Sequence, residues 1–259
     1  MRGSDLELPF IDLEDQKVYY AGDLEAAGIP ILFCHGSGGR HHHWAYQIKG
    51  LKGKGINPLA VDLPGHSRSE GLPFNNIGNY RDWLKRFARA AGLKEFIVAG
   101  HSMGGAIALA YALEFPDEVA GLILVGSGGR LRVLPALLDT LKDGTVPPSF
   151  ADYLYGPDTA DNLVKNGKKE IADTAASIYY ADLTACDKFD VMDDLPRVDK
   201  PVLIICGSED RLTPVKYSTY LQQSLPKAKL EVIDGAGHMV MLEKPDEVNS
   251  AITTYVNTL

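Results

Sequence analysis

The segment Gly100-His101-Ser102-Met103-Gly104 constrains the fold of this chain more than any other part of the sequence. It follows an apolar run at 96–99 and opens a helical pattern that extends over 103–115. A serine on a sharp turn between a strand and a helix needs a strained backbone, and glycines two residues before and after it remove the side chains that would clash. The pattern predicts a turn that presents the Ser102 hydroxyl above a sheet.

Short apolar runs bounded by glycine, proline and aspartate recur along the chain. Continuous apolarity over about four residues indicates strands buried on both faces, as in a parallel sheet covered by helices. The runs are 31–34, 58–61, 96–99, 122–125, 202–205 and 230–233. Apolar residues spaced by three and four at 77–91 and at 248–259 predict amphipathic helices. This alternation predicts an α/β fold with a mostly parallel, doubly wound sheet.

The alternation stops after Val125. From 131 to 195 the sequence has helical stripes but no run typical of a buried strand. This stretch carries one apolar helical stripe and six aromatic side chains, which we interpret as packing residues that can also line a cleft. They are Leu131, Leu134, Leu138 and Leu141 in the stripe, and Phe150, Tyr153, Tyr155, Tyr179, Tyr180 and Phe189. We therefore predict a helical cap at 131–195, inserted into one core formed by 1–130 and 196–259.

A serine hydroxyl attacks a carbonyl carbon only when a base takes its proton, so a histidine must lie beside Ser102. His238 follows the last predicted strand in a glycine-rich loop, from which its side chain can reach across the top of the sheet. A carboxylate is expected after the strand at 202–206, where Glu209 and Asp210 are neighbours. Motif position favours Asp210, which would orient the imidazole and stabilise its charged form. Glu209 is interpreted as a solvated loop charge.

Two backbone amides are predicted to stabilise the oxyanion that forms on attack. Met103 opens a helix directly after the nucleophile, where its amide is free to bind negative charge. The second donor is assigned to Ser37, within the glycine-rich segment 35–39 that follows the first core strand. A dinucleotide site is excluded there because His41 stands where a third glycine would be needed. No cofactor is expected.

Three adjacent histidines, His41, His42 and His43, resemble a metal-binding cluster. No cysteine or suitably spaced carboxylate lies near them in the sequence, so we interpret them as a solvated helix start and predict no metal site. The sequence also contains no HExxH zinc motif and no phosphate-binding lysine motif.

Charge and hydropathy exclude several classes of partner. The formal net charge of −8 disfavours nucleic acid, whose phosphates are neutralised by Lys and Arg. No apolar run approaches the roughly 20 residues that cross a bilayer, and the first ten residues lack the pattern of a signal peptide. Cys34, Cys186 and Cys206 are too few and too scattered for a disulfide framework. We expect a cytoplasmic protein with no membrane partner and reduced cysteines.

The ordered motifs at 35–39, 62–69, 100–104, 207–214 and 237–238 resemble the α/β-hydrolase superfamily over nearly the whole chain, except the first dozen residues and the cap. The resemblance implies an α/β-hydrolase fold, a nucleophile, acid and base in the order Ser102, Asp210, His238, and no cofactor. It also implies that 62–69 is a structural loop. Within the superfamily the chain looks most like small bacterial carboxylesterases with a helical cap.

This resemblance favours hydrolysis of small carboxylic esters with short to medium acyl chains through an acyl-enzyme. Cleavage of carbon to carbon bonds in ring-fission products, as in some relatives, stays open, with Arg130 and Arg132 as either an anion clamp or surface charges. Acyl transfer, including perhydrolysis, and a receptor role for a small molecule with an intact triad stay open as well. The serine disfavours dehalogenase and epoxide hydrolase chemistry, which uses an aspartate in the family. A homodimer is compatible with the sequence.

Overall fold

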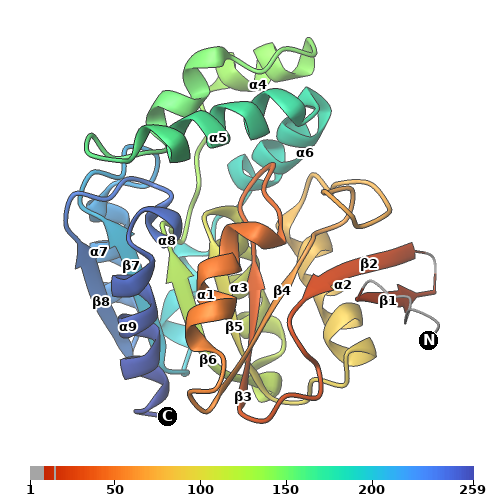
Figure 1. Ribbon diagram of the computed structural model, residues 1–259, viewed down its shortest axis with the longest axis vertical. Helices are drawn as coiled ribbons and strands as arrows, with labels where there is room; N and C mark the ends of the chain where they lie inside the picture. The colour runs from red at the N-terminus through yellow and green to blue at the C-terminus, as the bar shows by residue number, and fades with distance from the viewer. Residues whose placement is uncertain (1–8, 15) are drawn as a thin grey trace, which may run out of the picture.

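A computed structural model describes residues 9–14 and 16–259, and its centre is an eight-stranded sheet (Figure 1). The strand order is β1-β2-β4-β3-β5-β6-β7-β8. Strands β3 to β8 are parallel, whereas β1 and β2 are antiparallel to their neighbours. The strands are β1 Phe10–Leu13, β2 Gln16–Ala21, β3 Ile29–Cys34, β4 Ile56–Val61, β5 Phe96–His101, β6 Val119–Val125, β7 Val202–Gly207 and β8 Ala228–Ile233.

Each of the six predicted apolar runs lies inside one of the parallel strands, and five of them are buried. The prediction of burial on both faces is wrong for 230–233, because β8 is the last strand of the sheet and its residues are exposed or only partly buried. The antiparallel strands β1 and β2 were not predicted. Their positions mix exposed and buried residues, and polar residues interrupt or shorten the apolar pattern, Asp12 in β1 and Gln16 and Lys17 in β2. β2 joins the sheet by pairing Tyr20 and Ala21 with β4.

Helices cover both faces of the sheet, which confirms the predicted doubly wound α/β architecture (Figure 1). In β3, Leu32 and Cys34 pack into one apolar cluster, and Ile31 and Phe33 pack into the other. This alternation follows from the two-residue period of a strand. The helices are α1 Ala45–Leu51, α8 Val240–Glu243 and α9 Pro245–Val256 on one face, with α2 Ile77–Ala90, α3 Met103–Glu114 and α7 Val215–Ser224 on the other.

The predicted helix at 77–91 is observed as α2, with a buried stripe that includes Tyr80 and Phe87. Asn76 caps its start, since the side chain accepts a hydrogen bond from the Gly78 amide. The predicted helix at 248–259 begins earlier, at Pro245, and ends at Val256.

Between β6 and β7 the chain forms only helical elements, which lie above the carboxyl end of the sheet (Figure 1). Within 131–195 no described residue joins the sheet. A small apolar cluster of Leu141, Ala151, Ile171 and Tyr179 packs these helices together. Treating this cap as a domain separate from the core stays a prediction. The cap elements are α4 Pro135–Lys142, the 3-10 helix Pro148–Tyr153, α5 Asp161–Asp173, α6 Ala176–Asp187 and the 3-10 helix Met192–Arg197.

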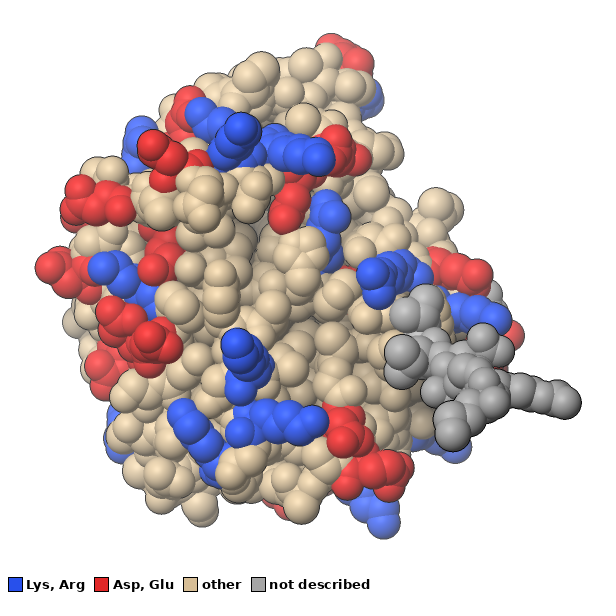
Figure 2. All heavy atoms as spheres, viewed as in Figure 1, with Lys and Arg blue, Asp and Glu red and all other residues tan. Residues whose placement is uncertain are grey.

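On the face shown in Figure 2, Lys and Arg side chains lie over α5 with acidic side chains beside them, and a second group of basic side chains lies lower on the same face. Lys165, Lys168 and Lys169 are exposed on that helix. Among the described residues, no helix is both long and apolar enough to cross a bilayer.

Candidate active site

Ser102 stands on a strained turn between β5 and α3, as the sequence predicts. Its backbone has a φ of 52° and a ψ of −115°, in the left-handed half of conformational space that side chains disfavour. A Cβ on Gly100 would overlap the Gly104 carbonyl, and a Cβ on Gly104 would overlap the Cys34 carbonyl. Both glycines are therefore required for the turn to pack against β3.

His238 and Asp210 are brought together from the loops that follow β8 and β7. The His238 Nδ1 donates to Asp210 Oδ2 at 2.9 Å, and both side chains are buried. Asp210 also accepts hydrogen bonds from the Thr213 amide at 2.9 Å and the Thr213 hydroxyl at 2.8 Å. Burial acts to raise the pKa of Asp210, but the charge of His238 and these hydrogen bonds outweigh it and hold the pKa well below its ordinary value. The carboxylate is therefore ionised and able to orient the imidazole.

Glu209 has no such contacts with His238. Its carboxylate meets only the Ser208 hydroxyl, at 3.4 Å, on the exposed side of the loop. Of the two neighbouring acids, only Asp210 hydrogen-bonds to His238 among the described residues.

His101 supports His238, a role that the sequence pattern does not reveal. Its Nε2 donates to the His238 carbonyl at 3.0 Å, and the two rings lie 4.5 Å apart. Burial and the neighbouring His238 lower the pKa of His101 well below its ordinary value, so the ring is neutral. Only the folded chain brings the two histidines together, because 137 residues separate them.

The loop that carries the Ser37 amide is held to the core by His35. Its Nε2 accepts from the Leu63 amide at 3.0 Å, and its Nδ1 donates to the Gly36 carbonyl at 2.8 Å. Burial lowers the pKa of His35 far below its ordinary value, which agrees with this neutral tautomer. Ser37 lines the same cavity as Ser102, and the Met103 amide lies at the first position of α3, where it has no intrahelical acceptor. The Met103 amide thus lies next to Ser102, and Ser37 borders the same cavity.

A buried carboxylate of the cap, Asp182 in α6, holds the same loop from above. It accepts from the Gly38 amide at 2.8 Å, from His66 Nε2 at 2.9 Å and from the Tyr80 hydroxyl at 2.5 Å. His66 Nδ1 donates to the Pro64 carbonyl at 2.9 Å, so both ring nitrogens are donors and the ring is an imidazolium. Burial acts to lower the pKa of His66, but Asp182, the Pro64 carbonyl and Asp62 together raise it by more. No sequence pattern marks Asp182.

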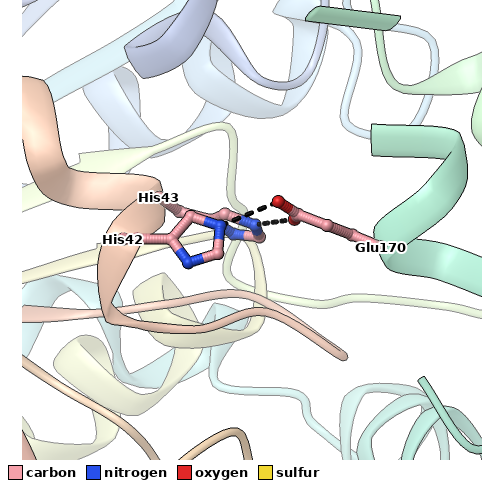
Figure 3. A group of neighbouring side chains, drawn as sticks. All are labelled: His42, His43 and Glu170. Carbon is pink, nitrogen blue, oxygen red and sulfur yellow. Dashed lines mark hydrogen bonds and ion pairs between the residues drawn. The ribbon is translucent and has the colours of Figure 1, made fainter. Parts of the chain in front are cut away.

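The three adjacent histidines begin a 3-10 helix, as predicted, but the prediction that they are solvated is wrong. His41 Nδ1 contacts Asp62 at 3.0 Å, whereas His42 and His43 both contact the cap residue Glu170 (Figure 3). His43 is buried. The error arises because α5 folds over the histidines from 127 residues away.

A cavity of about 530 Å³ lies between the core and the cap. Ser37, Ser102 and His238 form part of its floor, and residues of the insertion supply much of the remaining wall. Four of the six aromatic residues predicted to pack or line a cleft do line it, namely Phe150, Tyr153, Tyr155 and Tyr179. Phe189 instead packs into the apolar cluster beneath the cap.

The two arginines considered for an anion clamp share one carboxylate, Asp190. Arg130 approaches this carboxylate at 3.6 Å and Arg132 at 3.8 Å. Arg132 also donates to the Asp187 carbonyl at 2.8 Å, although it borders the cavity. Both arginine side chains and Asp190 are about half exposed, which is more typical of surface ion pairs than of an anion clamp.

The sequence model of the alpha/beta hydrolase family matches residues 31–251, and the chain belongs to this family. The eight-stranded, mostly parallel sheet with flanking helices is thus an α/β-hydrolase fold.

Individual relatives cover nearly the whole chain. A non-heme haloperoxidase of Rhodococcus erythropolis is 26% identical over 280 residues, which are 97% of this chain and 100% of that protein. A 2-hydroxy-6-oxononadienedioate/2-hydroxy-6-oxononatrienedioate hydrolase of Dechloromonas aromatica (strain RCB) is 27% identical over 271 residues, with coverages of 93% and 91%. A solved thermophilic esterase is 32% identical, with a TM-score of 0.84 and coverages of 96% and 97%. These similarities support hydrolase activity without selecting a substrate class.

Proposed function

We propose that the protein is a serine carboxylesterase in which Ser102 is the nucleophile, His238 the general base and Asp210 the acid that orients it. The observation that carries this proposal is the 2.9 Å hydrogen bond from His238 to Asp210, together with the presence of Ser102 and His238 in one cavity. The similarity to a thermophilic esterase, at 32% identity, supports the same activity.

In the first half of the reaction, the Ser102 hydroxyl oxygen attacks the ester carbonyl carbon while His238 Nε2 takes the hydroxyl proton. Negative charge develops on the carbonyl oxygen and is stabilised by the amides of Ser37 and Met103. The tetrahedral intermediate then collapses, and His238 gives its proton to the departing alcohol oxygen.

In the second half, water attacks the acyl-enzyme. His238 takes a proton from that water, and the Ser102 oxygen leaves with the proton that His238 returns. The products are a carboxylic acid and an alcohol, and the enzyme is restored. Asp210 stays ionised throughout, because its low pKa keeps the proton on the imidazole.

We propose substrates with short to medium acyl chains. The cap roofs the cavity, and apolar side chains such as Leu137, Ile171 and Leu183 line its walls, which suits a small acyl group. The exposed lysines of α5 interrupt the cap surface (Figure 2), whereas an enzyme that works at a lipid surface needs a broad apolar patch. Hydrolysis should therefore need no oil interface.

The test is kcat/KM for nitrophenyl acetate, butyrate, octanoate and palmitate below their solubility limits, with Ser102→Ala as the matched blank. We expect an optimum at acetate to octanoate and almost no rate with the variant. An optimum at palmitate, or a jump in rate when micelles form, would contradict the roofed cavity. A single turnover followed by arrest would identify a receptor rather than an enzyme.

Carbon to carbon bond hydrolysis is a second candidate, because a relative from Dechloromonas aromatica bears the name of such a hydrolase and Arg132 borders the cavity. The pairing of Arg132 with Asp190 and Asp187 weakens its role as an anion clamp. Assaying a ring-fission dienol acid beside the aryl esters distinguishes the candidates. A kcat/KM for the acid above that for every ester would favour the second.

A further inference from the structure

His42 and His43 on the core meet Glu170 of the cap helix α5 in one compact group (Figure 3). The His42 Nε2 lies 2.8 Å from one carboxylate oxygen of Glu170, and the His43 Nε2 lies 2.9 Å from the other. The three potential ligand atoms all lie within 4.8 Å of one another. Thus two imidazoles and one carboxylate converge from segments that are 127 and 128 residues apart.

This donor set suits zinc. Zn²⁺ binds imidazole nitrogen at about 2.0–2.1 Å and carboxylate oxygen at about 2.0–2.2 Å, and sites with three protein ligands keep a fourth position for water or another small ligand. Two of the three side chains, His43 and Glu170, also line the cavity, so the fourth position can open toward it. The sequence places no carboxylate near the histidines, but the fold brings Glu170 to them.

The surroundings of the group include one competing cation. The Arg40 guanidinium reaches the Thr174 hydroxyl at 3.4 Å and acts on His43 electrostatically. It opposes a divalent ion, whereas the ionised Glu170 attracts one. Burial of His43 restricts its side chain before any ion arrives, which reduces the entropy lost on binding.

We propose that His42, His43 and Glu170 bind a zinc ion that clips the cap to the core at the edge of the cavity. The ion takes no part in the attack by Ser102, whose proton goes to His238. It binds only where η1, the 3-10 helix His41–Trp44, and α5 are both in place, so it stabilises the closed cap by mass action. This proposal does not rest on the esterase assignment, since it concerns a separate group of ligands.

The test begins with protein stripped of metal by chelation and dialysis. Equilibrium dialysis against zinc should give one ion per chain, and zinc at about 100 times its Kd should raise Tm by roughly 5–10 °C. Cobalt(II) added in place of zinc should give the visible absorption of a four-coordinate nitrogen and oxygen site. Hydrolysis of nitrophenyl butyrate should persist in the stripped protein.

Three variants locate the ion. Glu170→Gln keeps the size of the side chain but removes its charge, and His42→Ala alters a side chain that is 42% exposed, so both should fold. Loss of a residue that only hydrogen-bonds to a metal ligand weakens metal binding by roughly 10- to 100-fold. Each of these two variants removes a ligand itself and should weaken zinc binding by more than that. Asp173→Asn, on the exposed side of the same helix, is the matched control and should bind zinc like the wild type.

The proposal is overturned if the wild-type protein binds no zinc in dialysis, or if Glu170→Gln and His42→Ala bind it as tightly as the Asp173→Asn control. An equal Tm shift in all four proteins would likewise place the ion elsewhere. Loss of ester hydrolysis on stripping, with recovery on adding zinc, would contradict the assignment of a purely structural ion.

Discussion

The loops of the core and the helices of the cap line the same cavity, but they are held in different ways. Ser102, Asp210 and His238 follow three parallel strands whose residues are almost all buried and apolar, except in β8. The cap has a small apolar cluster of its own and packs residues such as Ala185 and Phe189 into a core cluster, and two of its carboxylates add polar contacts with the core. Asp182 and Glu170 of the cap both bind core residues.

The core and the cap therefore have different roles in the proposed reaction. The core supplies the groups that we propose react, and apolar packing fixes their positions. The cap supplies walls and also holds the loop of Ser37 through the bond from Gly38 to Asp182. Removing the Ser102 hydroxyl from the core should therefore abolish turnover with little loss of stability, whereas variants at the cap contacts should lower stability and disturb turnover moderately.

The largest expected effect is at the acid of the core. Asp210→Asn should lower kcat by about 10⁴, as loss of the orienting carboxylate does in a serine protease, because the imidazole then adopts the wrong tautomer. Glu209→Gln is the matched control, since its carboxylate contacts only Ser208, and should change kcat little. Steady-state kinetics with nitrophenyl butyrate provides the measurement. If Glu209→Gln is the damaging variant, the assignment between the neighbours is wrong.

The core could be predicted from sequence because its strands and its turns have recognisable patterns over a few consecutive residues. The six parallel strands appear as apolar runs, although β8 is only partly buried, and the turn at Ser102 appears as two glycines at fixed spacing. The antiparallel strands β1 and β2 were missed because polar residues interrupt or shorten their apolar pattern, Asp12 in β1 and Gln16 and Lys17 in β2.

The contacts of the cap could not be predicted, because each joins residues far apart in the chain. Asp182 bonds to Gly38 over 144 residues, and His42 bonds to Glu170 over 128. A lone acid in a helical stripe looks like any solvated charge until the fold places it. The solvated interpretation of the three histidines failed for this reason.

The second prediction concerns the buried cap carboxylate. Asp182→Ala leaves the His66 imidazolium without its partner, and breaking a buried ion pair in this way costs about 3–5 kcal/mol of unfolding free energy. The Ser37 loop also loses the anchor at Gly38, so kcat should fall while the triad stays intact. Urea unfolding and kinetics on one preparation measure both effects. Asp173→Ala, in the same cap, is the control, and equal behaviour of the two variants would refute the anchor.

The smallest predicted effect is a pH dependence of stability. The pKa of His66 is raised in the folded protein. Its contribution to the free energy of unfolding is therefore fully present below about pH 6.5 and is lost as the pH rises through the folded pKa. Asp182, Asp62 and His35 face this ring. Asp210 has the opposite sign, since its lowered pKa adds stability above about pH 4 that is lost on acidification.

Urea unfolding between pH 5 and 9 in a chelating buffer checks this sign. The wild-type protein should lose stability as the pH rises through the folded pKa of His66, and His66→Gln should not show this loss. Identical pH profiles for the two proteins would show that the pair between core and cap carries no titrating charge.

The most direct test of the central claim is covalent labelling of the nucleophile. A fluorophosphonate should add once per chain, peptide mapping by mass spectrometry should place it on Ser102, and hydrolysis should stop in proportion to labelling. Ser102→Ala should take up no label, and His238→Ala should react far more slowly, because the hydroxyl then lacks its base. Labelling at another residue, or ester hydrolysis that continues after full modification of Ser102, would contradict the account.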